Sequence, residues 1–251
     1  MRLYQPENTP QANLEILAAN SYLGRFFVQG FFMQEPGDKV YVQAYGLEGR
    51  SEGSRNRTLQ QNEDGSVSTK VFDMAKQVGD PALTLYRAMD SVNGIHVVSN
   101  GNQTTTAIEY LRQGKSFEEA INTRDYEPDE PNYTPRISGY IDAEQSKFGI
   151  SIIRKLAVSR LAVRTLFTEQ SPEIELTPEV GYAVHTYQGD GNPLPPFDEA
   201  PFKLPLRDTA QTMAELMWDN LDTNNRVAVA AKVFTSTSQD IFIINRHEGS
   251  N

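Results

Sequence analysis

Alternating apolar and polar positions dominate the chain and predict strands more often than helices. Residues 22–34 are rich in aromatic and β-branched side chains, and residues 39–45 alternate with the two-residue period of a half-buried strand. The turn sequence at 35–38 joins these segments into a predicted hairpin. The same criteria predict strands over residues 66–72, 94–99, 137–142, 148–153, 156–166, 180–187, 226–234 and 241–245.

Fewer helices than strands are predicted, and most of them begin at a recognisable capping sequence. Thr9-Pro10 and Asp80-Pro81 each place a capping residue before a proline, which predicts helices over about 9–19 and 80–90. Ser116-Phe-Glu-Glu119 is a capping box. Helices are also predicted over residues 103–112 and 208–220, and the latter has apolar side chains on one face.

The order of these elements predicts the fold class. Helices stand in groups between blocks of strands instead of alternating with them, which favours an α+β fold over a parallel doubly wound sheet. We expect a four-layer αββα sandwich that forms a single domain over residues 1–251, with residues 1–20 as an N-terminal extension. Residues 46–57, 125–136 and 189–205 are expected to be loops.

Composition narrows the chemistry. The 251 residues include no cysteine and only three histidines, so a thiolate nucleophile and a cysteine-based metal site are excluded. A net charge of −10 argues against nucleic-acid or anionic-membrane partners. The chain has no run of about 18 apolar residues and no apolar N-terminal signal, so we expect a cytoplasmic location. We also expect no bound metal ion or cofactor.

The strongest local signal is the segment of residues 46–57. It combines glycines with Arg50, Arg55 and Arg57, and Arg forks beside free backbone N–H groups suit a phosphate monoester. The alternative is a solvated basic loop. Gly49-Arg-Ser51-Glu-Gly53 also matches the serine-nucleophile pattern, but no helix is expected after it.

Two further segments are candidate sites. Residues 125–130 gather carboxylates in a proline-constrained loop, which suits an acid/base group or is simply a charged turn, and its spacing is not that of an EF-hand. Asn100-Gly101 ends a predicted buried strand, where an amide can read a base edge or merely form a turn. The three histidines are expected to be structural.

These segments, in this order, resemble the archaeal-type IMP cyclohydrolase family, as a divergent member. The resemblance is carried by Tyr22-Leu-Gly-Arg25, Ala44-Tyr45, Arg50-Ser51, Asn56-Arg57, Val97–Gly101, Asp125–Glu130 and Thr134–Ile137, and it covers residues 21–160 best. It implies the fold of the N-terminal-nucleophile hydrolases without a self-processing nucleophile. It also implies closure of a formamido-imidazole-carboxamide ribotide to inosine monophosphate, with loss of water.

The resemblance also implies roles for individual residues. Arg57 and Tyr86 are expected to be donors near the reacting oxygen, and Glu127 is expected to orient the carboxamide or relay its proton. The residues expected to bind the substrate include Arg25, Arg50, Ser51 and Asn56. Asn100 and Gly101 are expected at the base edge. Arg136 is expected either to contact the phosphate or to pair with the acidic loop.

The chain departs from the family pattern in places. Residues 52–55, Tyr133 and the loop 189–205 look inserted, and Tyr86 is displaced by one position. A related amide or ribotide hydrolase, a non-catalytic purine-nucleotide-binding protein and a serine hydrolase through Ser51 and His247 are therefore alternatives. The sequence leaves a homo-oligomer open.

Overall fold

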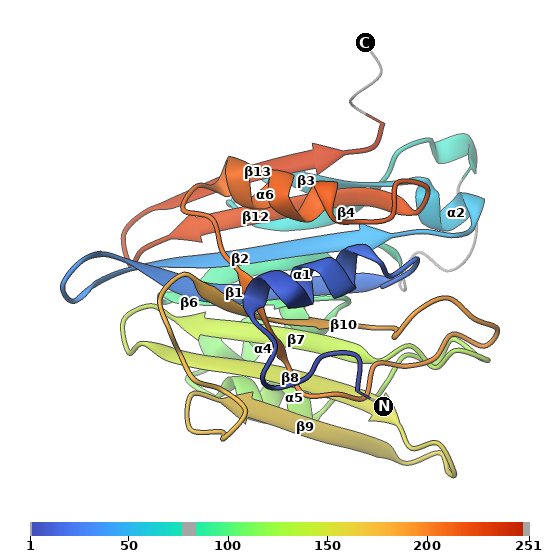
Figure 1. The fold of residues 1–251 in the computed structure, drawn as a ribbon, viewed down its shortest axis with the longest axis horizontal. Coiled ribbons are helices and arrows are strands. Elements are labelled where there is room, and N and C mark those ends of the chain that lie inside the picture. Colours follow the sequence, from blue (N-terminus) through green and yellow to red (C-terminus); the bar gives the residue numbers. More distant parts are fainter. Residues whose placement is uncertain (1, 77–83, 248–251) are drawn as a thin grey trace.

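The computed structural model describes residues 2–76 and 84–247, and this part of the chain has a mixed α/β fold with two antiparallel sheets and few helices (Figure 1). One sheet contains, in order, β11 (Phe202–Pro205), β10 (Val180–His185), β1 (Arg25–Glu35), β2 (Asp38–Glu48), β12 (Arg226–Phe234) and β13 (Gln239–Asn245). The other contains β3 (Arg57–Gln61), β4 (Val67–Val71), β5 (Arg87–Val92), β6 (Ile95–Ser99), β7 (Arg136–Asp142), β8 (Lys147–Lys155) and β9 (Ala162–Thr168).

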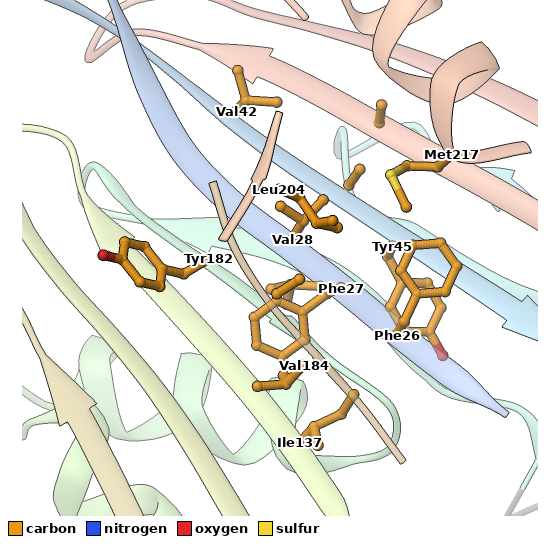
Figure 2. Close-up of a cluster of buried hydrophobic side chains, with 14 of the residues drawn as sticks. Phe26, Phe27, Val28, Val42, Tyr45, Ile137, Tyr182, Val184, Leu204 and Met217 are labelled. Atoms are coloured by element: carbon orange, nitrogen blue, oxygen red, sulfur yellow. The ribbon is translucent and has the colours of Figure 1, made fainter. Parts of the chain in front are cut away.

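The predicted hairpin is the long β1–β2 pair at the centre of the first sheet. Its register sets Phe27 opposite Tyr45 and Gln29 opposite Gln43, so these side chains share one face. That face meets the second sheet, because the Gln29 amide donates to the carbonyl of Gly149 at 2.9 Å. The main hydrophobic core therefore lies between the two sheets as well as under the helices. Figure 2 shows Phe26, Phe27 and Val28 of β1 among buried side chains from β2, β7, β10, β11 and α6 (Ala210–Asp219).

A close approach of the sheets requires a glycine at one point. A Cβ at Gly139 of β7 would lie 2.7 Å from the Phe27 ring and 2.5 Å from Gln29 Oε1. Gly139 thus lets β1 pack directly on the middle of β7, which fixes the spacing of the two sheets at this point.

The helices pack on the outer faces of the sheets. α4 (Gln103–Arg112) and α5 (Phe117–Asn122) bury Ile108 and Phe117 against Val97 and Ile153 of the seven-stranded sheet. α6 packs on β12, β13 and β2, and α1 (Pro10–Ala18) packs on β11. Figure 1 shows α1 and α6 in front of the sheets and α4 and α5 behind them. The short α2 (Glu52–Arg55) and a 3₁₀ turn, η1 (Met74–Lys76), lie at one end.

Several predictions that rest on short sequence signals, such as helix caps, are confirmed by the structure. Thr9 caps α1 with proline at the first position, Ser116 forms the capping box of α5, and the predicted bounds of α4 and β12 match the structure. None of the helices in the described residues is long and apolar enough to cross a membrane.

Other predictions are wrong where pairing overrides local signals. The start of the helix predicted over residues 80–90 lies outside the described residues, but its end is β5, in which Met89 pairs with Val98. Residues 46–57 are not a plain loop, because they contain the end of β2, α2 and the first residue of β3. Residues 156–161 form a turn before β9, and the predicted loop 189–205 ends in β11.

Candidate active site

Two guanidinium groups form the centre of the candidate site, that of Arg57 buried and that of Arg25 half-buried. Arg25 and Arg57 are the first residues of β1 and β3, so they enter the site from different sheets. Arg57 is 1 % exposed, and only its Nε is bonded, to the carbonyl of Ser54 at 2.9 Å. Both Arg57 Nη atoms and the Nε of Arg25 are buried without a hydrogen-bond partner within the described part of the chain. Buried donors are normally satisfied, so this arrangement points to an anionic or carbonyl ligand.

The electrostatics of the pair supports that conclusion. Burial and, to a smaller extent, the neighbouring charge of Arg25 together lower the pKa of Arg57 to about 10. The pKa of Arg25 is instead raised, because its burial is outweighed by Tyr86, Tyr22, Tyr45 and Glu127, which favour its charged form. A bound group with negative or developing negative charge would offset the cost that burial imposes on Arg57.

Tyrosine hydroxyls surround the two arginines. The hydroxyls of Tyr45 and Tyr86 are 2.7 Å apart, and both side chains are buried. Because one hydroxyl of such a pair donates to the other, the second O–H is left to donate elsewhere. Both tyrosines, together with Tyr22, interact electrostatically with Arg25 and Arg57. The predicted donors Arg57 and Tyr86 are therefore neighbours in the structure.

Glu127 lies at the same site and is suited to proton transfer. Its side chain is buried, and its backbone N–H donates to the carbonyl of Thr134 at 3.0 Å. Burial raises the pKa of Glu127 to about 7, although Arg136 and Arg25 act in the opposite direction. A carboxyl group with this pKa can both give and take a proton near neutral pH.

Arg136 and Gly101 border Glu127. Arg136 donates from Nε to the carbonyl of Asp125 at 2.7 Å and from Nη1 to Gln103 Oε1 at 2.8 Å, and its Nη1 is 3.7 Å from Glu127 Oε1. A Cβ at Gly101 would lie 2.7 Å from that Nη1. Gly101 is thus required by the close approach of the arginine. Of the two predicted roles of Arg136, the structure shows contacts with the acidic loop.

Asn100 is bonded through its whole amide group. Its Nδ2 donates to the carbonyl of Pro135 at 2.9 Å, and its Oδ1 accepts from Gln103 Nε2 and from the backbone of Ile137, each at 2.9 Å. These bonds tie the end of β6 to the start of β7. One N–H of the Nδ2 group takes part in none of these bonds and could serve the predicted contact with a base edge, which stays a prediction.

The arginine-rich segment divides into residues inside and outside the site. Arg50 is half-exposed; it pairs with Asp190, donates to the carbonyl of Gly191 at 3.0 Å and lies 5.0 Å from the ring centre of Tyr22. Asn56 holds the backbone of Asp73 with both of its amide atoms, each at 2.8 Å. The predicted substrate contacts of these two residues remain predictions.

Ser51 is engaged in local structure. It is the N-cap of α2 and its Oγ accepts from the backbone N–H of Ser54 at 3.1 Å. His247 Nε2 contacts the carbonyl of Arg55 at 2.9 Å, and its ring stacks on Phe72. These contacts give Ser51 and His247 separate structural roles, which weakens the serine-hydrolase alternative.

Sequence reasoning missed several residues of the site. Tyr22 and Tyr45 belong to segments that carry the family resemblance. Tyr22 lies three residues before Arg25, and Tyr45 comes near Arg25 through the pairing of β2 with β1. Tyr187, which follows β10, stacks on Tyr22 with ring centres 5.9 Å apart. No local sequence signal marks Tyr187, because it reaches the site only through the pairing of β10 with β1.

A family model described as IMP cyclohydrolase-like protein matches residues 22–239. The matched range spans both sheets and includes Arg25, Arg57, Tyr86 and Glu127. The match covers well over half of the chain, and the chain therefore belongs to the IMP cyclohydrolase-like family.

Proposed function

We propose that this protein is an IMP cyclohydrolase, which closes the formyl ribotide to inosine monophosphate with loss of water. Membership of the family favours a small nucleotide substrate. The observation that carries the proposal is the set of buried, unpartnered guanidinium nitrogens of Arg57 and Arg25, beside the Tyr45–Tyr86 hydroxyl pair and Glu127. The fold proposed with this activity is the αββα sandwich of the N-terminal-nucleophile hydrolase type.

The chemistry needs what these residues supply. The carboxamide nitrogen attacks the formyl carbon of the same molecule, so holding both groups in reacting geometry lowers the barrier. The formyl oxygen gains negative charge, which Arg57 and the free hydroxyl of the Tyr45–Tyr86 pair stabilise by donating hydrogen bonds. Glu127 orients the carboxamide and moves protons at the reacting atoms. Arg25 supplies further positive charge next to Arg57.

The substrate phosphate is assigned to the outer part of the site. Arg50 and Ser51 are exposed residues just after β2, where a phosphate monoester can reach them while the imidazole group lies deeper. Asn56, Asn100, Gly101 and Arg136 then support the loops that border the substrate. This division follows from exposure, since the buried arginines face the reacting oxygen and the half-exposed Arg50 faces solvent.

The test is to incubate the purified protein with the formyl ribotide and to follow inosine monophosphate by absorbance and by mass. Formation of inosine monophosphate by the wild type, and its loss in Arg57→Met, supports the proposal. Release of formate together with the aminoimidazole ribotide would identify a related amide hydrolase instead. Tight binding of inosine monophosphate without turnover would identify a non-catalytic nucleotide-binding protein.

A further inference from the structure

Three hydrogen-bonded side chains extend from the candidate site toward the surface. The hydroxyl of Tyr187 contacts that of Thr134, and the Thr134 hydroxyl contacts the Asp129 carboxylate. The backbone N–H of Thr134 also donates to Asp129, at 2.7 Å. Tyr187 and Thr134 are 3 % and 5 % exposed, whereas Asp129 is only half-buried. We refer to Tyr187, Thr134 and Asp129 as the relay.

The inner end of the relay lies against residues of the site. The Tyr187 ring stacks on Tyr22, and a Cβ at Gly24 would lie 2.5 Å from Tyr187 Cδ2, so the ring packs on the residue next to Arg25. Thr134 is bonded to Glu127 through the backbone, at 3.0 Å. Arg25 also acts electrostatically on both Tyr187 and Glu127, which places both side chains near that guanidinium group.

The hydrogen bonds of the relay have a direction. A carboxylate only accepts, so Thr134 uses its one hydroxyl hydrogen to donate to Asp129. Thr134 can then only accept from Tyr187, which leaves a lone pair on the Tyr187 oxygen for a proton from another group. Burial raises the pKa of Tyr187 above its ordinary value, so its hydroxyl remains protonated and passes a proton on without becoming a phenolate. The other ionisable groups that act on Tyr187 are Asp129, Arg25 and Tyr22.

The proposed reaction moves two protons from nitrogen to oxygen. In each step one group accepts a proton while another group donates one, and a single carboxyl group fills only one of these two roles. The carboxamide nitrogen loses a proton when the C–N bond forms, and the formamido nitrogen loses one when water leaves. Both protons end on the formyl oxygen. A site that catalyses both steps needs an acceptor and a donor that exchange roles between the steps.

On the basis of the proposed function, the geometry points to Tyr187 as a further catalytic residue, coupled through Thr134 to Asp129 as the second acid/base group of the reaction. In the first step the carboxamide nitrogen gives its proton to Tyr187, Tyr187 gives its own to Thr134, and Thr134 gives its own to Asp129. The C–N bond forms, and Glu127 protonates the formyl oxygen.

In the second step the direction reverses. Glu127, now ionised, takes the proton of the formamido nitrogen, and Asp129 returns its proton through Thr134 and Tyr187 to the departing hydroxyl group. The C–O bond breaks, water leaves and the C=N bond forms. Both carboxyl groups are then back in their starting states. No oxidant, reductant or further reactant is needed.

The experiment compares Tyr187→Phe, Thr134→Val, Thr134→Ser and Asp129→Asn with the wild type. Tyr187→Phe and Thr134→Val each remove one link with little change in volume, and we expect kcat to fall about 100-fold while KM stays within about twofold. Thr134→Ser keeps the hydroxyl and should restore most of the rate. The matched control is Tyr182→Phe, because Tyr182 is also buried but its hydroxyl is bonded to the backbone of Glu175.

The pH profile of kcat/KM and the Thr134→Ser variant separate a relay from a purely structural role. The wild type should lose activity above about pH 7, where Glu127 is ionised, and Thr134→Val should keep this limb in place while its rate falls. A shifted limb in Thr134→Val, which would show that the substitution disturbs Glu127, or a Thr134→Ser variant as slow as Thr134→Val, would overturn the inference. If the wild type forms no inosine monophosphate, it is the proposed function that fails.

Discussion

Replacement of Arg57 by methionine should separate stability from activity. Arg57 is fully buried beside Arg25, and its two Nη atoms have no partner in the described residues. Methionine fills a similar volume with a flexible apolar side chain, so it removes the charge without opening a large cavity. We expect the variant to be inactive and yet at least as stable as the wild type.

The magnitude follows from the structure. The lowering of the Arg57 pKa to about 10 corresponds to about 3 kcal/mol of destabilisation of the charged form. The bond from Nε to the Ser54 carbonyl offsets this, because losing it costs about 1 kcal/mol. The net expectation is a gain of about 2 kcal/mol in the free energy of unfolding. For a chain of this length, that corresponds to a rise of roughly 4–8 °C in Tm.

Denaturant unfolding and the turnover assay together test this expectation. Arg55→Met is the matched control, since Arg55 is satisfied by the carbonyl of Gly49 at 2.9 Å and by Asn225 at 3.0 Å. That control should lose stability and keep most of its activity. The reasoning is refuted if Arg57→Met is more than about 1 kcal/mol less stable than the wild type, or if it turns over substrate at the wild-type rate.

Three further predictions concern charge. Lys232 is 1 % exposed and burial lowers its pKa to about 7, so Lys232→Met should stabilise the protein by up to about 5 kcal/mol at pH 6. That gain should shrink between pH 7 and 10.5, where only the unfolded chain still binds the proton, whereas a constant gain in urea titrations would contradict the cause. Glu127→Gln should lower kcat about 100-fold. It should also raise Tm at pH 8 but not at pH 4, because the raised pKa of Glu127 makes its ionised form destabilise the folded protein. Equal Tm changes at both pH values would argue against this cause. Asp190→Ala frees Arg50 and should lower KM for the ribotide about threefold, while Arg50→Ala should raise it, and unchanged KM values in both would remove Arg50 from the phosphate site.

Local sequence signals predict the elements that local bonds stabilise. Caps at Thr9 and Ser116 and the β1–β2 alternation are of this kind. The strand of residues 87–92 falls within a segment predicted as a helix, because the start signal at Asp80-Pro81 outweighs the turn at Asn93-Gly94, where positive φ angles join β5 to β6. β3 was missed although it pairs with the neighbouring β4 across the turn of residues 62–66, because its polar residues lack a strand pattern.

The candidate site shows the same limit. Arg57, Tyr86 and Glu127 were predicted from residue types and the family resemblance, and the structure places them close together around Arg25. Tyr187 acquires its interest only from its contact with Thr134, 53 residues away in the chain, whereas Asp129 lies five residues from Thr134. Ser51 and Asn100, in contrast, have side chains of a suitable type whose bonds hold the local backbone. The sequence indicates which polar side chains the chain contains. Only the packing shows which of their donors and acceptors have no partner within the described part of the protein.

The most direct test of the account is a single-turnover experiment with the formyl ribotide, in which wild type and Arg57→Met are compared at equal concentration and the product is identified by its mass. We predict that the wild type converts the ribotide to inosine monophosphate with the loss of one water molecule, and that Arg57→Met yields none while remaining folded. Failure of the wild type to form inosine monophosphate, or equal rates for the two proteins, would contradict the central claim that the buried arginine pair stabilises the reacting oxygen.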